Sequence, residues 1–199
     1  MELLFASSNK NKIKEIAALL PKDYVLSGLQ DVGVFEEIPE TGQTIKDNSL
    51  LKAQYVVSFL KNKNTAMAVF ADDSGLEVEA LNNAPGVYSA RYAGVPKSDE
   101  SNNKKLLTEL KGVSNRNARF VTVITLILND TIHYFEGEVK GAIGPKPSGY
   151  NGFGYDPLFI PEGYSNTFAD LSPEIKNSIS HRSIAVKKLI RFLEQQAQR

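Results

Sequence analysis

The sequence predicts an α/β fold built on a mixed β-sheet. Apolar runs typical of strands alternate with segments whose apolar residues recur at helical spacing, and two β-rich runs flank one short polar turn. Such an alternation with an internal hairpin is typical of helices packed on a sheet of mixed strand direction. The 199 residues suit one domain, or two lobes that share one core, so we expect a single domain over residues 1–199.

In the first half of the chain, helices are predicted from apolar residues at i, i+3, i+4 and i+7, and strands from short apolar runs. The run AMAVFA is apolar throughout, which indicates a strand buried on both faces. We expect that strand to end where the polar segment Asp72–Gly75 begins. The predicted strands are Glu2–Ala6, Val25–Leu29 and Ala66–Ala71, and the predicted helices are Asn9–Leu20 and Ile45–Leu60.

In the second half, two β-rich runs around Asn129–Asp130 predict a hairpin. The segment Gly141–Pro157 holds five of the 14 glycines and three of the nine prolines, which predicts a long shaped loop. The predicted strands are Arg119–Leu128 and Thr131–Val139, and the predicted helices are Ser98–Leu110 and Ser180–Gln196.

Composition excludes several kinds of site and partner. The chain has no cysteine and two histidines, so thiolate zinc sites, cysteine nucleophiles and multi-histidine metal sites are not expected. A metal would depend on oxygen ligands, which favours magnesium or manganese. The formal net charge of zero argues against a nucleic-acid partner. Because no apolar run reaches membrane-spanning length and MELLFASSNK has no basic leader, we expect no membrane partner and a cytoplasmic protein.

A candidate anion site lies between the first predicted strand and the first predicted helix. Its residues are Ser7, Ser8, Asn9, Lys10, Asn11 and Lys12. A helix N-terminus presents unpaired N–H groups and the positive end of the helix dipole, which suit a phosphate. Lysines there oppose the dipole unless an anion binds. The alternative is structural, because serine and asparagine cap helices and lysines are solvated.

Two adjacent carboxylates, Asp72 and Asp73, are expected at the end of a buried strand, with Ser74 after them. Neighbouring like charges favour a bound cation, and ligands of α/β sheets bind beyond the carboxyl ends of strands. Magnesium is typically held by one or two carboxylates together with substrate phosphates. The alternative is a polar turn, since Asp, Ser and Gly are turn formers.

Three further segments carry candidate residues. On the second predicted helix, Lys52 either points into a cleft or lies along the edge of the core as a snorkelling side chain, with Asp47 on the adjoining face. In Asn151–Pro157, glycines let the backbone approach a flat ligand and an aromatic ring stack on a base, or the aromatic residues fill the core. His181 and Arg182 occupy the first turn of the last helix, where cations oppose the dipole, so they are either ligand contacts or solvated side chains.

Together these segments resemble the inosine triphosphate pyrophosphatase (Ham1-like) family. SSNKNK, DNSLLKA, ADDSGLEV, GVYSARYAG, GFGYDP and KNSISHR occur in the family's order over nearly the whole chain. The resemblance implies an elongated α/β fold with two lobes and a central active-site cleft, a homodimer, and Mg²⁺ dependence. It also implies hydrolysis of ITP, dITP or XTP to the monophosphate and pyrophosphate, which clears these nucleotides from the pool.

The resemblance assigns roles motif by motif. Asp73 matches the proton acceptor and metal ligand, and Ser74 follows it as a substrate contact. The remaining matches are Ser7, Asn9 and Lys12 for phosphate binding, Lys52 for the lysine of the second helix, Phe153, Gly154, Tyr155 and Asp156 for the nucleoside-binding loop, and Lys176, His181 and Arg182 for base recognition. The family usually has glutamate where this chain has Asp47, whose shorter side chain would reach a metal less readily and through water.

These residues suit transfer of the α-phosphoryl group to water, in which positioning and charge neutralisation dominate. Lys12 and Lys52 are predicted to hold the β- and γ-phosphates, and Mg²⁺ is predicted on Asp73 with help from Asp72 or Asp47. Because lysine and arginine only donate, they suit the C6 oxygen of hypoxanthine or xanthine better than the amino group of adenine. Open alternatives are a pyrophosphatase for other modified bases, a non-catalytic nucleotide-binding module and an RNA-binding protein.

Overall fold

A computed structural model describes residues 1–62 and 67–198 and is mixed α/β, as predicted. Its seven-stranded sheet has the order β2-β1-β3-β5-β6-β7, and β4 pairs with β3. The strands are β1 (Glu2–Phe5), β2 (Val25–Ser27), β3 (Ala68–Val78), β4 (Ala84–Pro85), β5 (Asn117–Leu128), β6 (Thr131–Ile143) and β7 (Phe159–Pro161). The α-helices are α1 (Lys10–Leu19), α2 (Ile45–Lys61), α3 (Asp99–Glu109), α4 (Pro173–Ile179) and α5 (His181–Ala197), and the 3-10 helices are η1 (Gln30–Val32), η2 (Glu79–Leu81) and η3 (Gly86–Arg91).

The chain divides into two compact units. Unit 1 consists of Met1–Asp73, Thr122–Gly137 and Arg182–Arg199, and unit 2 of Ser74–Val121 and Glu138–His181. Strands β3, β5 and β6 have residues in both units, and the first residue of α5 is the last residue of unit 2. Each unit has its own buried apolar clusters.

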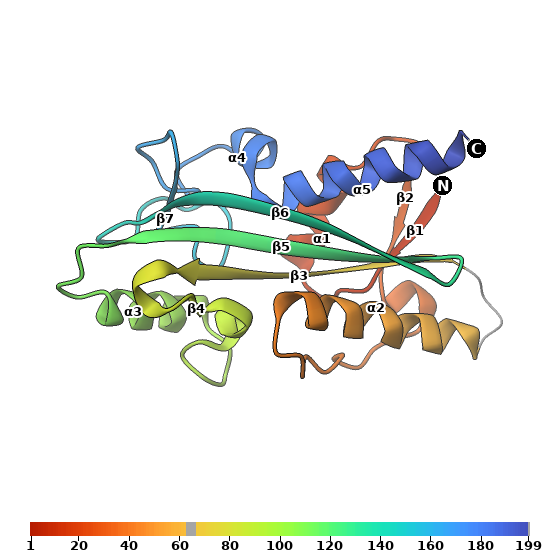
Figure 1. Cartoon of the computed structure of the whole chain (residues 1–199), viewed down its shortest axis with the longest axis horizontal. Helices are drawn as coiled ribbons and strands as arrows, with labels where there is room; N and C mark the ends of the chain where they lie inside the picture. The colour runs from red at the N-terminus through yellow and green to blue at the C-terminus, as the bar shows by residue number, and fades with distance from the viewer. Residues whose placement is uncertain (63–66, 199) are drawn as a thin grey trace. The chain divides into compact units, whose positions relative to one another are not determined.

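In unit 1, helices cover both faces of the strands. β1 pairs in parallel with β2 and with β3, and Leu4 is opposite Val69. One face of these strands packs against α1 and α5, whose Ile16 and Leu189 are fully buried. The other face packs against α2 through residues such as Val56. Figure 1 shows α5 and α2 on opposite sides of the strands, so the charged residues that β3 carries can meet helices on either face.

In unit 2, the core is rich in aromatic residues. The rings of Phe120 and Phe159 have centroids 4.7 Å apart, and those of Phe159 and Phe168 are 5.2 Å apart. Leu106 of α3 belongs to the same cluster as Leu76 of β3. Helix α3 is therefore anchored in this core by its apolar face.

Most predicted elements are confirmed, with small changes at their ends. The predicted helices correspond to α1, α2, α3 and α5, and the hairpin to β5 and β6. The turn residues Asn129 and Asp130 have φ values of 49° and 60°, the left-handed conformation that two-residue hairpin turns require. One end of the predicted strand Ala66–Ala71, Ala66, lies outside the described residues.

The predicted end of β3 is wrong. The strand continues through Asp72–Gly75 to Val78, so these polar residues lie within a strand and do not form a turn. Pairing of Glu77 and Val78 with β4 and burial of Leu76 and Val78 supply the reason, because both stabilise an extended continuation. Likewise β6 runs to Ile143, so the predicted loop begins later, and the short elements β7 and α4 were not predicted.

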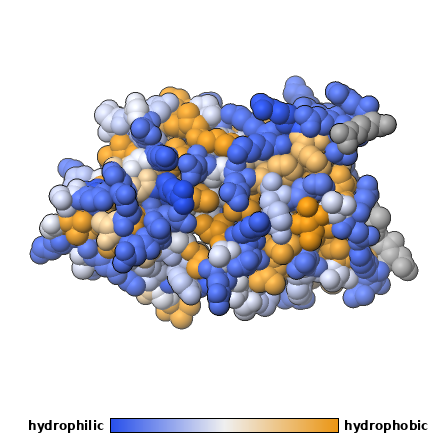
Figure 2. All heavy atoms as spheres, viewed as in Figure 1, coloured by the Kyte–Doolittle hydropathy of each residue, from blue (hydrophilic) through white to orange (hydrophobic). Residues whose placement is uncertain are grey.

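One face of the molecule carries both polar and apolar residues at its surface (Figure 2). Figure 2 shows hydrophobic residues in separate groups among hydrophilic ones on the face that it presents. In the part of the chain that the structure describes, no helix is both long enough and apolar enough to cross a membrane.

Candidate active site

The N-terminus of α1 is capped by Asn9. Its side-chain oxygen accepts hydrogen bonds from the N–H groups of Asn11 and Lys12 at 3.0 and 3.2 Å, and Ser7 Oγ accepts from the N–H of Asn9 at 3.2 Å. The capping alternative is therefore confirmed, because these N–H groups are already bonded within the chain. Ser8, Asn9, Lys10 and Asn11 are exposed, whereas Lys12 is partly buried. Phosphate binding at this segment stays a prediction, and Lys12 is its best-placed donor.

Strand geometry separates the two adjacent carboxylates. Ala68 and Phe70 of β3 belong to the cluster with α1 and α5, and Ala71 belongs to the cluster with α2. Because successive strand residues point to opposite faces, Asp72 continues the first face and Asp73 the second. Both are buried, with 0% and 6% of their surface exposed. The two carboxylates predicted to share one metal thus face different helices.

On the α1 and α5 side, Asp72 joins two cations. Lys12 Nζ lies 3.0 Å from Asp72 Oδ1, and Arg182 Nε lies 3.1 Å from Asp72 Oδ2. The Arg182 guanidinium also pairs with Glu15, three residues after Lys12 and so on the same side of α1. The Arg182 side chain is 2% exposed. Arg182, predicted to recognise the base, is therefore held among the predicted phosphate-binding residues of unit 1.

On the α2 side, one lysine bridges two carboxylates. Lys52 Nζ lies 3.1 Å from Asp73 Oδ1 and 2.7 Å from Glu40 Oε1. Lys52 is 7% exposed, so its ammonium is buried beside these carboxylates and is not solvated as a snorkelling lysine would be. That it points into a substrate cleft stays a prediction. Ser49, one turn earlier, fixes the helix on the sheet, because its Oγ is 3.1 Å from Ala71 O and 2.8 Å from Thr125 Oγ1.

The segment that carries Glu40 is attached to α2 by Asn48. Asn48 Oδ1 accepts a hydrogen bond from the Gly42 N–H at 2.7 Å. A Cβ at Gly42 would lie 2.7 Å from that same oxygen, so only glycine fits without displacing the helix. Glu40 is therefore held near Lys52 by backbone contact as well as by charge.

Burial and ion pairing act in opposite directions on these charges. Burial would raise the pKa of Asp72, but Lys12 and Arg182 hold that pKa well below its ordinary value. For Asp73, burial prevails over Lys52 and raises the pKa. Burial lowers the pKa of Lys12, although Asp72 opposes the effect. Asp73 is thus the more basic of the two carboxylates, which suits a proton acceptor.

Carboxylates suitable for a metal are few. Over residues 1–62 and 67–198, no group of three or more Asp, Glu or His side chains is arranged to hold a metal ion. Asp47 has another function in the structure: its carboxylate accepts from the Thr44 N–H at 3.1 Å, while Thr44 Oγ1 accepts from the Asp47 N–H at 3.0 Å. This capping box stabilises the start of α2. Asp73 and Glu40 remain, and they already converge on one cation, the Lys52 ammonium.

In unit 2, the glycine-rich loop positions Phe153. The Phe153 N–H donates to Asp156 Oδ2 at 2.8 Å. Gly152 has a φ of 78°, and a Cβ there would lie 2.0 Å from the Asp156 carboxylate, so the loop requires glycine at this position. Lys176 Nζ donates to the same carboxylate at 2.6 Å and lies 5.0 Å from the centre of the Phe153 ring. A half-buried aromatic face, an ammonium and a carboxylate therefore lie together, which suits a flat polar ligand.

Two other predicted residues are packed in the core of unit 2. Tyr155 is 4% exposed, its hydroxyl donates to Ser89 O at 2.9 Å, and burial raises its pKa. The imidazole of His181 stacks on Phe120, with centroids 4.7 Å apart and planes 9° apart. These side chains support the loop and the start of α5, so the core-filling alternative is confirmed for Tyr155. Ser74 is half-buried at the start of unit 2.

The predicted site residues therefore form two groups, one in each unit. Lys12, Lys52, Asp72, Asp73 and Arg182 form the ion-pair cluster of unit 1, and Phe153, Asp156 and Lys176 form the aromatic cluster of unit 2. Sequence reasoning missed Glu15 and Glu40. The spacing of Glu15 from Lys12 was a usable signal, but Glu40 lies in a loop without a helical or strand pattern.

Comparison with known proteins shows the family of this chain. A sequence model described as the Ham1 family matches residues 3–192. The chain belongs to the Ham1 family. A dITP/XTP pyrophosphatase of Flavobacterium psychrophilum is 52% identical over 194 residues, which cover 98% of this chain and 100% of that protein. One of Bacillus subtilis is 43% identical over 97% of this chain and 97% of its own length.

Solved structures of the Ham1 family have the same fold. The Ham1 protein of Staphylococcus aureus matches with a TM-score of 0.87 and 43% identity, over 98% of this chain and 100% of that chain. A HAM1 protein of Coxiella burnetii matches with a TM-score of 0.87 and 37% identity, over 98% and 99% of the two chains. Family membership, which the sequence motifs predicted, is thus confirmed.

Proposed function

We propose that this chain hydrolyses purine nucleoside triphosphates that carry hypoxanthine or xanthine, and releases the monophosphate and pyrophosphate. Relatives at 43–52% identity over nearly the full chain are dITP/XTP pyrophosphatases. The observation that carries the proposal is the buried ion-pair cluster of unit 1, because it gathers two lysines around the carboxylates of β3. A non-catalytic binder of polyanions would gain little from two carboxylates beside its lysines without metal chemistry.

Lys12 and Lys52 bind the phosphates in this proposal. Both ammonium groups are paired with carboxylates in the free protein, so a triphosphate exchanges these partners for its own oxygens. Charge neutralisation and positioning supply most of the catalysis of phosphoryl transfer. The Asp73 carboxylate accepts the proton of the attacking water, which its raised pKa favours.

Asp73 and Glu40 would hold a magnesium ion. The fit rests on the Lys52 ammonium, which shows that both carboxylates can reach a single cation. Two carboxylates with substrate phosphates and water are a usual magnesium environment, so a third acidic ligand is not required. When bound, the ion neutralises charge on the phosphate oxygens and on the pyrophosphate leaving group. Asp47 remains a candidate only through water, because its carboxylate caps α2.

Phe153 and Lys176 recognise the base. The ring stacks on the purine, and Lys176 donates to the C6 oxygen of hypoxanthine or xanthine. Adenine has an amino group at C6 and would leave the N–H of Lys176 that faces the base without an acceptor there, which disfavours adenine by about 1–3 kcal/mol. Arg182 is a second candidate donor, since a guanidinium has five N–H groups and can bind a ligand in addition to carboxylates.

The decisive experiment measures products from ITP, XTP, dITP, GTP and ATP with Mg²⁺. We expect the monophosphate and pyrophosphate, with ITP, dITP and XTP preferred, and loss of activity on chelation of the metal. Formation of a diphosphate and orthophosphate would overturn the proposal. A homodimer and a cytoplasmic location also remain expectations, and light scattering of the purified chain tests the first of them.

A further inference from the structure

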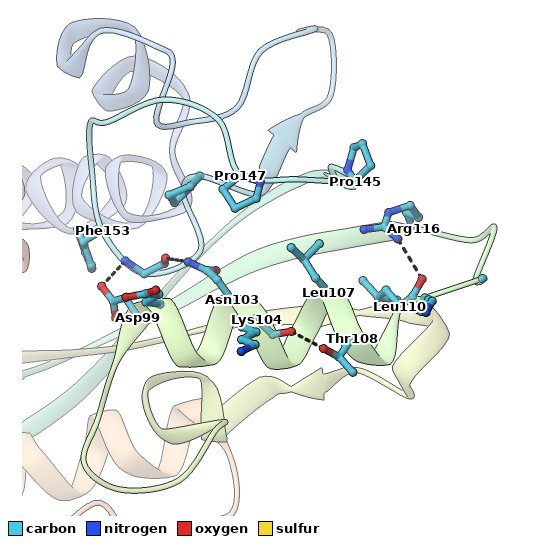
Figure 3. Close-up of a pocket in the computed structure, with 15 residues that line it drawn as sticks. Asp99, Asn103, Lys104, Leu107, Thr108, Leu110, Arg116, Pro145, Pro147 and Phe153 are labelled. Atoms are coloured by element: carbon cyan, nitrogen blue, oxygen red, sulfur yellow. Dashed lines mark hydrogen bonds between the residues drawn. The ribbon is translucent and has the colours of Figure 1, made fainter.

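Helix α3 holds the loop that carries Phe153. The N–H of Gly154 donates to Asp99 Oδ2 at 2.7 Å, and the Gly154 carbonyl accepts from Asn103 Nδ2 at 2.9 Å. Asp99 and Asn103 are four residues apart, so they lie on one face of α3. Figure 3 shows both bonds meeting the loop directly beside Phe153. Both backbone polar groups of one loop residue are therefore fixed by two side chains of one helix.

We propose that Asp99 and Asn103 are positioning residues that set the Phe153 ring for the nucleoside, an inference that rests on the proposed function of this loop. Gly154 has a φ of 62° and no side chain, so hydrogen bonds to its peptide groups are what fix its orientation. The preceding peptide group is held as well, because the Phe153 N–H donates to Asp156 Oδ2. The ring thus projects from a backbone clamped on both sides.

A groove beside these contacts explains why two bonds matter. The groove has a volume of about 960 Å³ and lies between α3 and the loop, with Leu107, Pro145 and Pro147 in its lining (Figure 3). At its far end, Arg116 donates to Leu110 O at 3.2 Å and to Gly144 O at 2.7 Å. The groove separates these contacts from those of Asp99 and Asn103. Hydrogen bonds at its two ends therefore hold this stretch of the loop against α3.

An asparagine at position 103 is unfavourable for the stability of the fold. It is 8% exposed, and its Oδ1 has no hydrogen-bond donor among the residues that the structure describes. A buried amide with an unsatisfied oxygen is less stable than an apolar side chain of similar size. The amide is therefore useful for the bond that its Nδ2 makes to the loop, and folding alone does not require it.

The test compares Asn103→Leu and Asp99→Ala with two control variants of the same helix, Glu100→Ala and Lys104→Ala. The controls line the same groove and make no bond to the loop among the described residues. We expect KM for ITP to rise about 3- to 10-fold in each test variant, the range for losing one hydrogen bond, with kcat within about 2-fold. The controls keep the wild-type KM. Asp99→Asn retains an acceptor oxygen and so restores a KM close to wild type.

Binding experiments separate positioning from a general loss of structure. Titration calorimetry should show weaker binding of IMP in the test variants by the same factor as KM, with binding of inorganic pyrophosphate, which has no base, unchanged. The melting temperature of Asn103→Leu should equal or exceed that of the wild type. Equal weakening of IMP and pyrophosphate, or an unchanged affinity for IMP, would overturn the inference. A wild-type chain that binds IMP but releases no pyrophosphate from ITP would overturn the proposed function and leave the IMP comparison to decide this inference.

Discussion

The two clusters of candidate residues are built in different ways. In the unit 1 cluster, Lys12, Lys52 and Arg182 each pair with a carboxylate. Apart from Glu40, these residues come from regular elements: β3 supplies both aspartates, and α1, α2 and α5 supply the cations. In unit 2, the side chains come from a glycine-rich loop and the short helix α4, and one ammonium lies near an aromatic ring. The first cluster therefore depends on strand alternation and helix faces, and the second on single hydrogen bonds.

This difference predicts different responses to substitution. The charges of the unit 1 cluster are largely buried and paired with one another, so removing one leaves its partners uncompensated and affects stability or turnover. Residues of unit 2 orient a ring and a donor, so removing one affects affinity and the choice of base.

Asp72→Asn is expected to destabilise the fold. The substitution keeps the shape of the side chain but leaves the buried cations of Lys12 and Arg182 without their shared carboxylate. Breaking a buried ion pair typically costs about 3–5 kcal/mol. In a chain of this size that corresponds to a fall in Tm of about 6–20 °C, measured by thermal unfolding. An unchanged Tm would show that the cluster of unit 1 is not structurally coupled.

Asp73→Asn is expected to affect turnover more than stability. Asp73 shares Lys52 with Glu40, so that lysine keeps one carboxylate partner after the substitution. Loss of a proton acceptor should lower kcat for ITP by at least about 10²-fold, with a much smaller change in KM. Steady-state pyrophosphate release measures both. Near-normal turnover would move the role of proton acceptor away from Asp73.

The contrast between the clusters also explains what could be predicted from the sequence. Helical spacing predicted α1, α2, α3 and α5, because one buried face repeats along each of them. The end of β3 could not be predicted, since Asp-Asp-Ser-Gly is typical of a turn until distant cations and the pairing with β4 stabilise it as a strand. Local patterns do not contain those long-range contacts.

The candidate site residues could also be predicted where local patterns mark them, and not where long-range contacts place them. Asp73 and Lys52 were predicted because each is a charged residue beside apolar ones, and the structure brings the two together in an ion pair. Glu40 was not predicted, because its position depends on a hydrogen bond between Gly42 and Asn48, which are six residues apart in the sequence. Motif resemblance grouped Arg182 with base recognition, whereas its ion pairs with Asp72 and Glu15 depend on tertiary packing.

Lys176→Met tests the role of the unit 2 cluster. The substitution keeps an unbranched side chain and removes the ammonium near Phe153. If Lys176 donates to the C6 oxygen, the ratio of kcat/KM for ITP to that for ATP should shrink by about 10- to 150-fold, the range for a charged hydrogen bond.

Arg182→Lys is the matched variant in unit 1. Equal losses for ITP and ATP in Arg182→Lys would assign Arg182 to the phosphates, whereas a smaller ratio would assign it to the base.

The smallest effect is expected for Asp47→Ala, which separates a carboxylate outside the clusters from those within. Asp47 is exposed and closes the capping box of α2 with Thr44, so its loss should remove only a favourable first-turn charge and one hydrogen bond. Because water replaces the exposed hydrogen bond, the first-turn charge dominates this loss; it contributes about 0.3–1 kcal/mol, which predicts a fall in Tm of no more than about 4 °C. The Mg²⁺ concentration for half-maximal activity should then stay at its wild-type value, whereas Glu40→Gln should raise it. An increase of about 10-fold in Asp47→Ala with an unchanged Tm would instead make Asp47 a metal ligand and extend the unit 1 cluster to the first turn of α2.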